Sequence, residues 1–257
     1  MSKKKIMIYY LLLFVIVIIS SVLLYKNENS MYVFVNNKEM WRKNNNNWKK
    51  VSNNYVKKYQ GEEFNFFLKS KFNGKIYYKY DGGSINLYDE NNTLINFGPS
   101  MISIKSKLNY DNVKTASELD NVEKDSNVVN ILDRFSLNKD QMVRIKKYEL
   151  DLDNDGKNDY LYSISNFYLG DEKADKRFSI IFSVINGDVN VVDKTIVDLD
   201  KQNSTWSTSL NSVIDLDLDN NFELILVSTS YGQDDIYCMK KYNSDSNKFE
   251  TLIDCEE

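Results

Sequence analysis

Two short acidic segments, each followed by an apolar run, constrain this chain of 257 residues more than any other feature. The first reads Asp-Leu-Asp-Asn-Asp-Gly-Lys-Asn-Asp over residues 151–159, with carboxylates at positions 1, 3, 5 and 9. Carboxylates crowded in this way repel one another unless a cation lies among them. The spacing supplies the hard oxygens that Ca²⁺ prefers, and the glycine at position 6 permits the sharp bend that turns them inward. We therefore expect a calcium loop here.

The candidate ligands of this first loop are four side chains and one backbone carbonyl. They are Asp151, Asp153, Asp155 and Asp159, together with the carbonyl of Lys157. The segment is not an EF-hand, because its twelfth position is Tyr162 rather than a bidentate glutamate. Residues 160–164 instead have the composition of a strand that leaves the loop. The alternative interpretation is an acidic hairpin turn that binds no ion tightly.

The pattern recurs 64 positions later, over residues 215–223, as Asp-Leu-Asp-Leu-Asp-Asn-Asn-Phe-Glu. Asparagine replaces the glycine, and it is the residue that tolerates left-handed geometry next best. The candidate ligands of this second loop are Asp215, Asp217, Asp219, Asn221 and Glu223, and the same two interpretations apply to them. The flanks repeat as well, so each copy indicates the order strand, acidic loop, strand, strand, turn, strand. A four-stranded antiparallel unit at a fixed period is typical of a propeller blade.

Residues 151–164 and 215–227 resemble the calcium loops of FG-GAP or VCBS-type repeats, which occur in integrin-α-like β-propellers. The resemblance covers residues 140–257. It implies one structural Ca²⁺ in each loop, bound by the candidate ligands named above, and an extracellular surface for recognition or adhesion. Only two such loops occur in the chain, so the fold expected from the resemblance is propeller-like or a partial propeller.

Residues 6–25 form an apolar run that no charged residue interrupts. A helix of that length rises about 30 Å, which matches the hydrocarbon core of a bilayer. Three lysines at 3–5 precede the run, while Lys26 and Glu28 cancel after it, so the positive-inside rule keeps the N-terminus in the cytoplasm. We expect a single-pass plasma-membrane anchor with an extracytoplasmic C-terminal domain. The alternative is a cleaved signal peptide, whose apolar core is usually shorter.

Charge divides the part after the anchor into two halves. Residues 26–110 contain 14 basic and 7 acidic residues, a net charge of +7, whereas residues 111–257 contain 16 basic and 30 acidic residues, a net charge of −14. Such asymmetry indicates two distinct halves. The expected organisation is a cytoplasmic tail (1–5), an anchor (6–25), a basic β-meander (26–110), a linker with one short helix (111–140) and a two-copy calcium-loop β repeat (141–257).

Local patterns suggest the elements within these regions. In the basic half, short aromatic and β-branched runs alternate with turn residues, including Asn73-Gly74, which predicts hairpins and possible further blades. Asparagine largely replaces glycine and proline at the turns. In the linker, residues 117–120 and 128–135 have helical spacing, with Ser126 or Asn127 as the N-cap.

The chain contains no histidine and two cysteines, which excludes histidine-based catalysis, histidine metal ligands and structural zinc or iron–sulfur sites. Its net charge of −4 disfavours sequence-independent nucleic-acid binding. Cys238 and Cys255 either form a disulfide with each other or remain two free thiols. Trp41 and Trp48 lie among lysines and form either a platform for glycans or anionic wall polymers, or part of a β core.

These observations favour an all-β ectodomain of antiparallel repeats behind one transmembrane helix. Its expected function is binding or scaffolding at the cell surface, with a protein or a cell-wall polymer as ligand and without catalysis. A structural accessory subunit of a membrane complex is the first alternative, and a carboxylate-based surface hydrolase is the second. Release of the ectodomain from its anchor distinguishes a binding protein from an accessory subunit, because the binding protein keeps its ligand and the accessory subunit loses its complex.

Overall fold

The computed structural model describes residues 14–15, 30–36, 39–44, 47–52, 58–81, 84–95, 100–119, 123–167, 174–198, 206–230 and 232–255. The expected anchor over residues 6–25 therefore lies outside the described residues, except for Phe14 and Val15, which are helical. No helix within the described part has the length and apolarity that a bilayer crossing requires.

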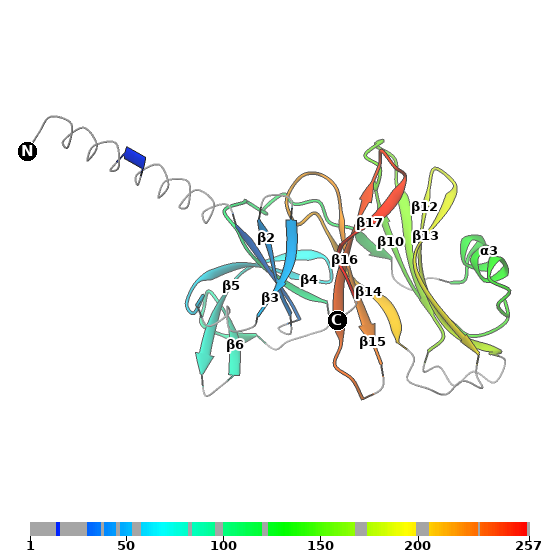
Figure 1. Ribbon diagram of the computed structural model, residues 1–257, viewed down its shortest axis with the longest axis horizontal. Coiled ribbons are helices and arrows are strands. Elements are labelled where there is room, and N and C mark those ends of the chain that lie inside the picture. Colours follow the sequence, from blue (N-terminus) through cyan, green and yellow to red (C-terminus); the bar gives the residue numbers. More distant parts are fainter. Residues whose placement is uncertain are drawn as a thin grey trace, which may run out of the picture.

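Apart from the helix over Ser126–Arg134 and the two helical residues Phe14 and Val15, the described chain is all-β, and its strands form three antiparallel sheets, none of which closes on itself (Figure 1). This confirms the expected all-β class. The first-repeat sheet has the order β13-β12-β11-β10-β9 and the second-repeat sheet the order β14-β15-β16-β17. Their strands are β9 (Ser117–Leu119), β10 (Arg144–Leu150), β11 (Asp159–Ser165), β12 (Lys176–Ile185), β13 (Asp188–Asp198), β14 (Ser207–Ile214), β15 (Glu223–Thr229), β16 (Ile236–Asn243) and β17 (Lys248–Ile253).

The two repeats have the same local topology. In each, two strands flank the acidic loop, the second of them pairs with a third strand, and a turn leads into a fourth. The first repeat departs from a four-stranded unit because β9 adds to the outer side of β10. The helical spacing of residues 117–120 predicts a helix, which is wrong for residues 117–119, since they form β9, and residue 120 lies outside the described residues. Pairing of Glu118 with Tyr148 across the sheet decides the conformation of that short segment.

The basic half forms one eight-stranded sheet, here called the N-terminal sheet, with the order β3-β2-β1-β8-β4-β5-β6-β7. It does not form two four-stranded blades, and it is not a simple meander, because β8 lies between β1 and β4. The strands are β1 (Met31–Val35), β2 (Glu39–Asn44), β3 (Asn47–Val51), β4 (Glu63–Leu68), β5 (Lys71–Asp81), β6 (Ser84–Asp89), β7 (Leu94–Ile95) and β8 (Met101–Lys105).

One expected hairpin turn in this sheet is misplaced. The chain reverses at Lys69 and Ser70, both of which have positive φ, and β5 runs through Asn73-Gly74. Gly74 has φ +95° at a point where the pairing of β4 with β5 shifts register, so it serves a β-bulge rather than a turn. Asparagine does act as a turn residue, since six of the eleven described non-glycine residues with positive φ are asparagines.

The three sheets are stacked face to face, with the second-repeat sheet in the middle (Figure 1). One of its faces packs on the first-repeat sheet, where Leu210 and Leu224 meet Leu161. Its other face packs on the N-terminal sheet, where Ile225 meets Val33. The buried aromatic Trp41 belongs to this second core. The middle sheet is thus apolar on both faces, and its burial is a main source of stability.

The helix α3 (Ser126–Arg134) covers the outer face of the first-repeat sheet (Figure 1). Its buried residues Val128, Ile131 and Leu132 pack against that sheet. The N-cap is Asp125, one residue before the expected Ser126 or Asn127, and its Oδ1 accepts a hydrogen bond from the amide of Val128 at 3.1 Å.

Candidate metal centres

The flanking strands place the first and last residues of each acidic loop side by side. In the first repeat β10 pairs with β11 so that Leu150 lies opposite Asp159. In the second repeat β14 pairs with β15 so that Ile214 lies opposite Glu223. The register is the same in both copies. Each loop therefore closes on the carboxylate at its ninth position.

The first loop is closed by hydrogen bonds from its own backbone to its carboxylates. Asp151 accepts from the amides of Asp155 and Gly156 at 3.1 Å each. Asp159 accepts from the amide of Leu152 at 2.9 Å. Asp155 turns the other way and accepts from the amide of Lys157 at 2.8 Å. The amides thus orient the carboxylates at positions 1 and 9 toward the interior of the loop.

The second loop repeats this framework with nearly equal distances. Asp215 accepts from the amides of Asp219 and Asn220 at 3.1 and 3.0 Å. Glu223 accepts from the amide of Leu216 at 2.8 Å. Asp219 accepts from the amide of Asn221 at 2.9 Å. The two loops are thus built on the same hydrogen-bond plan, despite glutamate at position 9 of the second.

Left-handed backbone geometry occurs at the same two positions of both loops. At position 4, Asn154 has φ 60° and Leu218 has φ 57°. At position 6, Gly156 has φ 82° and Asn220 has φ 69°. Asparagine therefore does replace glycine at position 6 without a change in loop conformation.

Each loop brings three of its carboxylates together. Oxygens of Asp151, Asp153 and Asp159 lie within 4.8 Å of one another, and so do oxygens of Asp215, Asp217 and Glu223. Each set can hold a metal ion. Position 5 is not part of either set, since Asp155 and Asp219 form ion pairs with lysines instead. At position 7, Lys157 and Asn221 are placed in the loops as amide donors, and a role for their carbonyls remains a prediction.

The first loop has an open side. Asp153 lines a cavity of about 330 Å³ between the β12–β13 turn and the β16–β17 turn. The side-chain amide of Asn186, which lies in the β12–β13 turn, donates a hydrogen bond from its Nδ2 to Asp153 at 2.9 Å. Asp159 is 3% exposed, and burial raises the pKa of its carboxyl. No lysine or arginine in the described ranges forms an ion pair with Asp151, Asp153 or Asp159.

The second loop differs because two ammonium groups enter it. Lys241 Nζ lies 2.8 Å from Glu223, 2.6 Å from Asp219 and 3.6 Å from Asp217. Lys43, from β2 of the N-terminal sheet, pairs with the other oxygen of Asp217. Sequence patterns did not reveal either lysine. Comparison of the residues that lie across the strand from position 9 of each loop could have revealed Lys241, whereas no local pattern indicates Lys43.

Burial controls the ionisation of this second site. Glu223 is fully buried, and burial, together with the charge of Asp217, raises the pKa of its carboxyl, whereas the ammonium of Lys241 opposes this shift and favours the carboxylate. Burial also disfavours the charged form of Lys241, but the carboxylates of Glu223, Asp219 and Asp217 outweigh it and hold the pKa of the ammonium above its ordinary value. The lysine is therefore a permanent cation among acidic groups.

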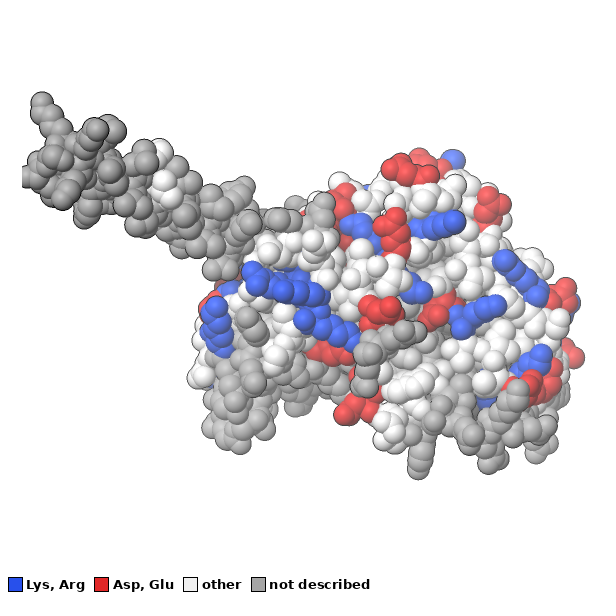
Figure 2. Space-filling model, viewed as in Figure 1, with Lys and Arg blue, Asp and Glu red and all other residues white. Residues whose placement is uncertain are grey.

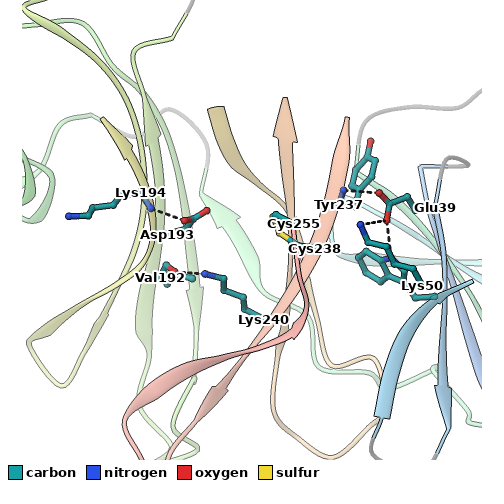
Figure 3. The surroundings of a disulfide bond; sticks show 10 residues. Glu39, Lys50, Val192, Asp193, Lys194, Tyr237, Cys238, Lys240 and Cys255 are labelled. Carbon is teal, nitrogen blue, oxygen red and sulfur yellow. Dashed lines mark hydrogen bonds and ion pairs between the residues drawn. A yellow bond between two sulfur atoms is a disulfide. The ribbon is translucent and has the colours of Figure 1, made fainter. Parts of the chain in front are cut away.

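A disulfide joins Cys238 to Cys255, which ties the end of the chain to β16. It lies between two inter-sheet grooves, with Lys240 bonded to Val192 on one side and Glu39 on the other (Figure 3). The groove beside Glu39 has a volume of about 710 Å³ and mixed polar and apolar walls.

The charge asymmetry of the sequence is visible on the surface. On the face drawn in Figure 2, Lys and Arg side chains gather over the N-terminal sheet. Of the two alternatives for the tryptophans, the structure supports the β core and not a surface platform. Trp41 is fully buried, and Trp48 packs against the core between the N-terminal and second-repeat sheets. Both tryptophans therefore serve the β core.

Comparison of the chain with family models, with curated proteins and with solved structures finds no match in any of the three.

Proposed function

We propose that this chain is a membrane-anchored, extracytoplasmic binding or scaffolding protein whose first acidic loop binds a structural Ca²⁺. The proposal rests chiefly on one observation. Asp151, Asp153 and Asp159 converge within 4.8 Å, and no lysine or arginine among the described residues forms an ion pair with them. Three converging carboxylates are a hard oxygen donor set, which suits Ca²⁺ better than a transition metal.

The role proposed for the ion is structural. It would hold together the β10–β11 connection at the end of the first-repeat sheet, next to the turn that carries Asn186. The face-to-face stacking of the three sheets resembles the way neighbouring blades pack in a propeller, which supports the propeller-like part of the proposal.

Export of the domain has support of its own. The bond between Cys238 and Cys255 persists in an oxidising compartment and is rare in the cytosol. The apolar run over residues 6–25 and the lysines before it supply the anchor and the orientation. Protease added to intact cells is expected to digest the domain, and full protection would contradict the orientation.

The calcium role is tested by thermal unfolding of the full-length chain with and without Ca²⁺. An ion that binds only the folded state adds about 2.7 kcal/mol at a hundredfold excess over its Kd. The melting temperature of the wild type is therefore expected to rise with Ca²⁺, and that of an Asp151→Asn/Asp153→Asn variant to stay constant. A wild type that does not respond to millimolar Ca²⁺ contradicts the proposal.

A further inference from the structure

The second loop contains a cation that the chain itself supplies. Lys241 lies directly opposite Glu223 in the pairing of β15 with β16. Its Nζ lies within 3.6 Å of oxygens from Asp217, Asp219 and Glu223. The Cβ atoms of directly opposite residues lie about 5 Å apart, so a lysine at this position is within reach of the carboxylate of Glu223. The ammonium thus stands where a metal ion would meet these carboxylates.

The first repeat has no such group at the corresponding place. There β11 pairs with β12 so that Tyr160 lies opposite Val184, and one further step along the strands brings Ile185 opposite Asp159. An aliphatic side chain offers no charge to that loop. Across the strand from position 9, the two copies therefore differ in having an aliphatic residue or a lysine, on matching hydrogen-bond frameworks.

Burial of the second loop also favours the ammonium of Lys241 over a metal ion. Glu223 is fully buried and Asp215 is 2% exposed, while only 8% of the Asp217 side chain is accessible. Lys43 adds a second positive charge from the N-terminal sheet. A divalent ion would have to shed its water and displace an ion-paired ammonium to enter. Displacement of the ammonium would leave Lys241 without its buried carboxylate partners, and this cost opposes entry of the metal ion.

We infer that Lys241 is the resident cation of the second loop, so that the chain binds Ca²⁺ in the first loop only and uses the second as an ionic tie between sheets. Lys43 makes the tie span two sheets, because β2 belongs to the N-terminal sheet and Asp217 to the loop of the second-repeat sheet. The inference concerns ion number and location, and it extends the proposed calcium role of the first loop.

The experiment counts bound Ca²⁺ per full-length chain after equilibrium dialysis. The wild type and a second-loop variant, Asp215→Asn/Asp217→Asn, are each expected to bind one ion. A first-loop variant, Asp151→Asn/Asp153→Asn, is expected to bind none. If the first-loop variant keeps an ion that is lost on further change of Asp215 and Asp217, the inference is overturned.

The decisive variants are made in the first-loop background. Lys241→Met removes the ammonium and is expected to create one binding site, whereas Lys241→Arg keeps the charge and is expected to create none. Lys240→Met is the matched control, because Lys240 is next in sequence but bonds to the carbonyl of Val192 instead. A folded Lys241→Met chain that binds no ion overturns the inference. If this variant does not fold, the ion count of the first-loop variant alone decides.

The outcomes separate the two proposals. A wild type that binds no Ca²⁺ contradicts the calcium role of the first loop, while a gain of one ion on Lys241→Met still supports the inference. A wild type that binds two ions, one lost with each loop, supports the first proposal and overturns the inference.

Discussion

Asp159 and Glu223, 64 residues apart, accept the same backbone hydrogen bond, each from the amide at the second position of its loop, at 2.9 and 2.8 Å. Both are almost fully buried, with 3% and 0% of the residue exposed. One has an aliphatic neighbour across the sheet and the other has Lys241. Equal frameworks with different charge partners make the two loops an internal comparison, in which one copy serves as the control for the other.

Removal of the charge at Asp159 is expected to abolish the stabilisation by Ca²⁺. The Asp159→Asn chain should melt at the same temperature with Ca²⁺ and with chelator, because one of three converging carboxylates is lost. Asp155→Asn is the control, since Asp155 lies in the same loop but pairs with Lys157. Calorimetry of both variants checks this. Equal responses to Ca²⁺ would show that the converging set is not the binding site.

Asp125 is expected to stabilise the helix α3 in a pH-dependent way. Burial raises the pKa of its carboxyl, but hydrogen bonds from Tyr162, from the Val128 amide and from Lys147 outweigh burial and hold the pKa below its ordinary value of 3.8. The folded state therefore binds this proton less readily than the unfolded state does. The stability that Asp125 contributes is present above the unfolded pKa and is lost as the pH falls through the folded pKa.

The matching variant is Asp125→Asn. Asparagine is itself a good N-cap, so this variant removes only the charge, which interacts with Lys147 and with the helix N-terminus, and is expected to cost about 0.5 kcal/mol at pH 7. The difference from the wild type should shrink as the pH falls below 3.8. Urea unfolding over a pH series measures it, and a difference that stays constant or grows at low pH would contradict the assignment.

Gly156→Ala is expected to destabilise the first loop through the backbone alone. Gly156 has φ +82°, and a Cβ at this position would meet nothing within 4 Å. The left-handed conformation costs an alanine roughly 1 kcal/mol. Lys157→Ala is the control, because this exposed neighbour has no positive φ. In thermal unfolding, the wild type and Lys157→Ala are expected to have similar melting temperatures, and Gly156→Ala a lower one. The reverse order would mean that the loop does not need this conformation.

Loss of the disulfide is expected to lower stability substantially. Cys238 and Cys255 are 17 residues apart, and in the loop-closure model a link over that length contributes about 3 kcal/mol. The Cys238→Ser/Cys255→Ser chain should therefore melt well below the wild type, and reductant should lower the wild type to the same level. A wild type insensitive to reductant under unfolding conditions would contradict the bond, which mass measurement checks independently.

Local patterns in the sequence predicted the loops well, because every contact that closes a loop lies within nine residues. Carboxylate spacing, a residue with left-handed geometry at position 6 and the following strand are all visible in such a window. The sequence also predicts the order of strands within each repeat, apart from β9, which adds a fifth strand to the first-repeat sheet. The spacing predicts Asp155 and Asp219 as ligands, whereas in the structure both carboxylates accept a hydrogen bond from the amide at position 7 and form ion pairs with lysines.

Contacts between distant segments were not predictable in this way. The strand β8 enters between β1 and β4, which no local pattern specifies. Lys43 reaches Asp217 from 174 residues away. Asp125, Ser126 and Asn127 are all good N-caps by residue type, so only the geometry of the turn selects the first of them. The features that the sequence did not predict are thus chiefly the strand order of the N-terminal sheet and the contacts between sheets.

The stacking order of the sheets has a consequence for biogenesis. The sheet at the centre of the stack is the last to be synthesised, so the nascent chain completes both outer layers before the layer that joins them exists. Until residues 207–253 arrive, each outer layer exposes the apolar face destined for the centre. Domains usually fold from the N-terminus as they emerge. Residues 207–253 must therefore insert between two layers that already exist, and a chain that lacks these residues is expected to expose both apolar faces to chaperones and proteases.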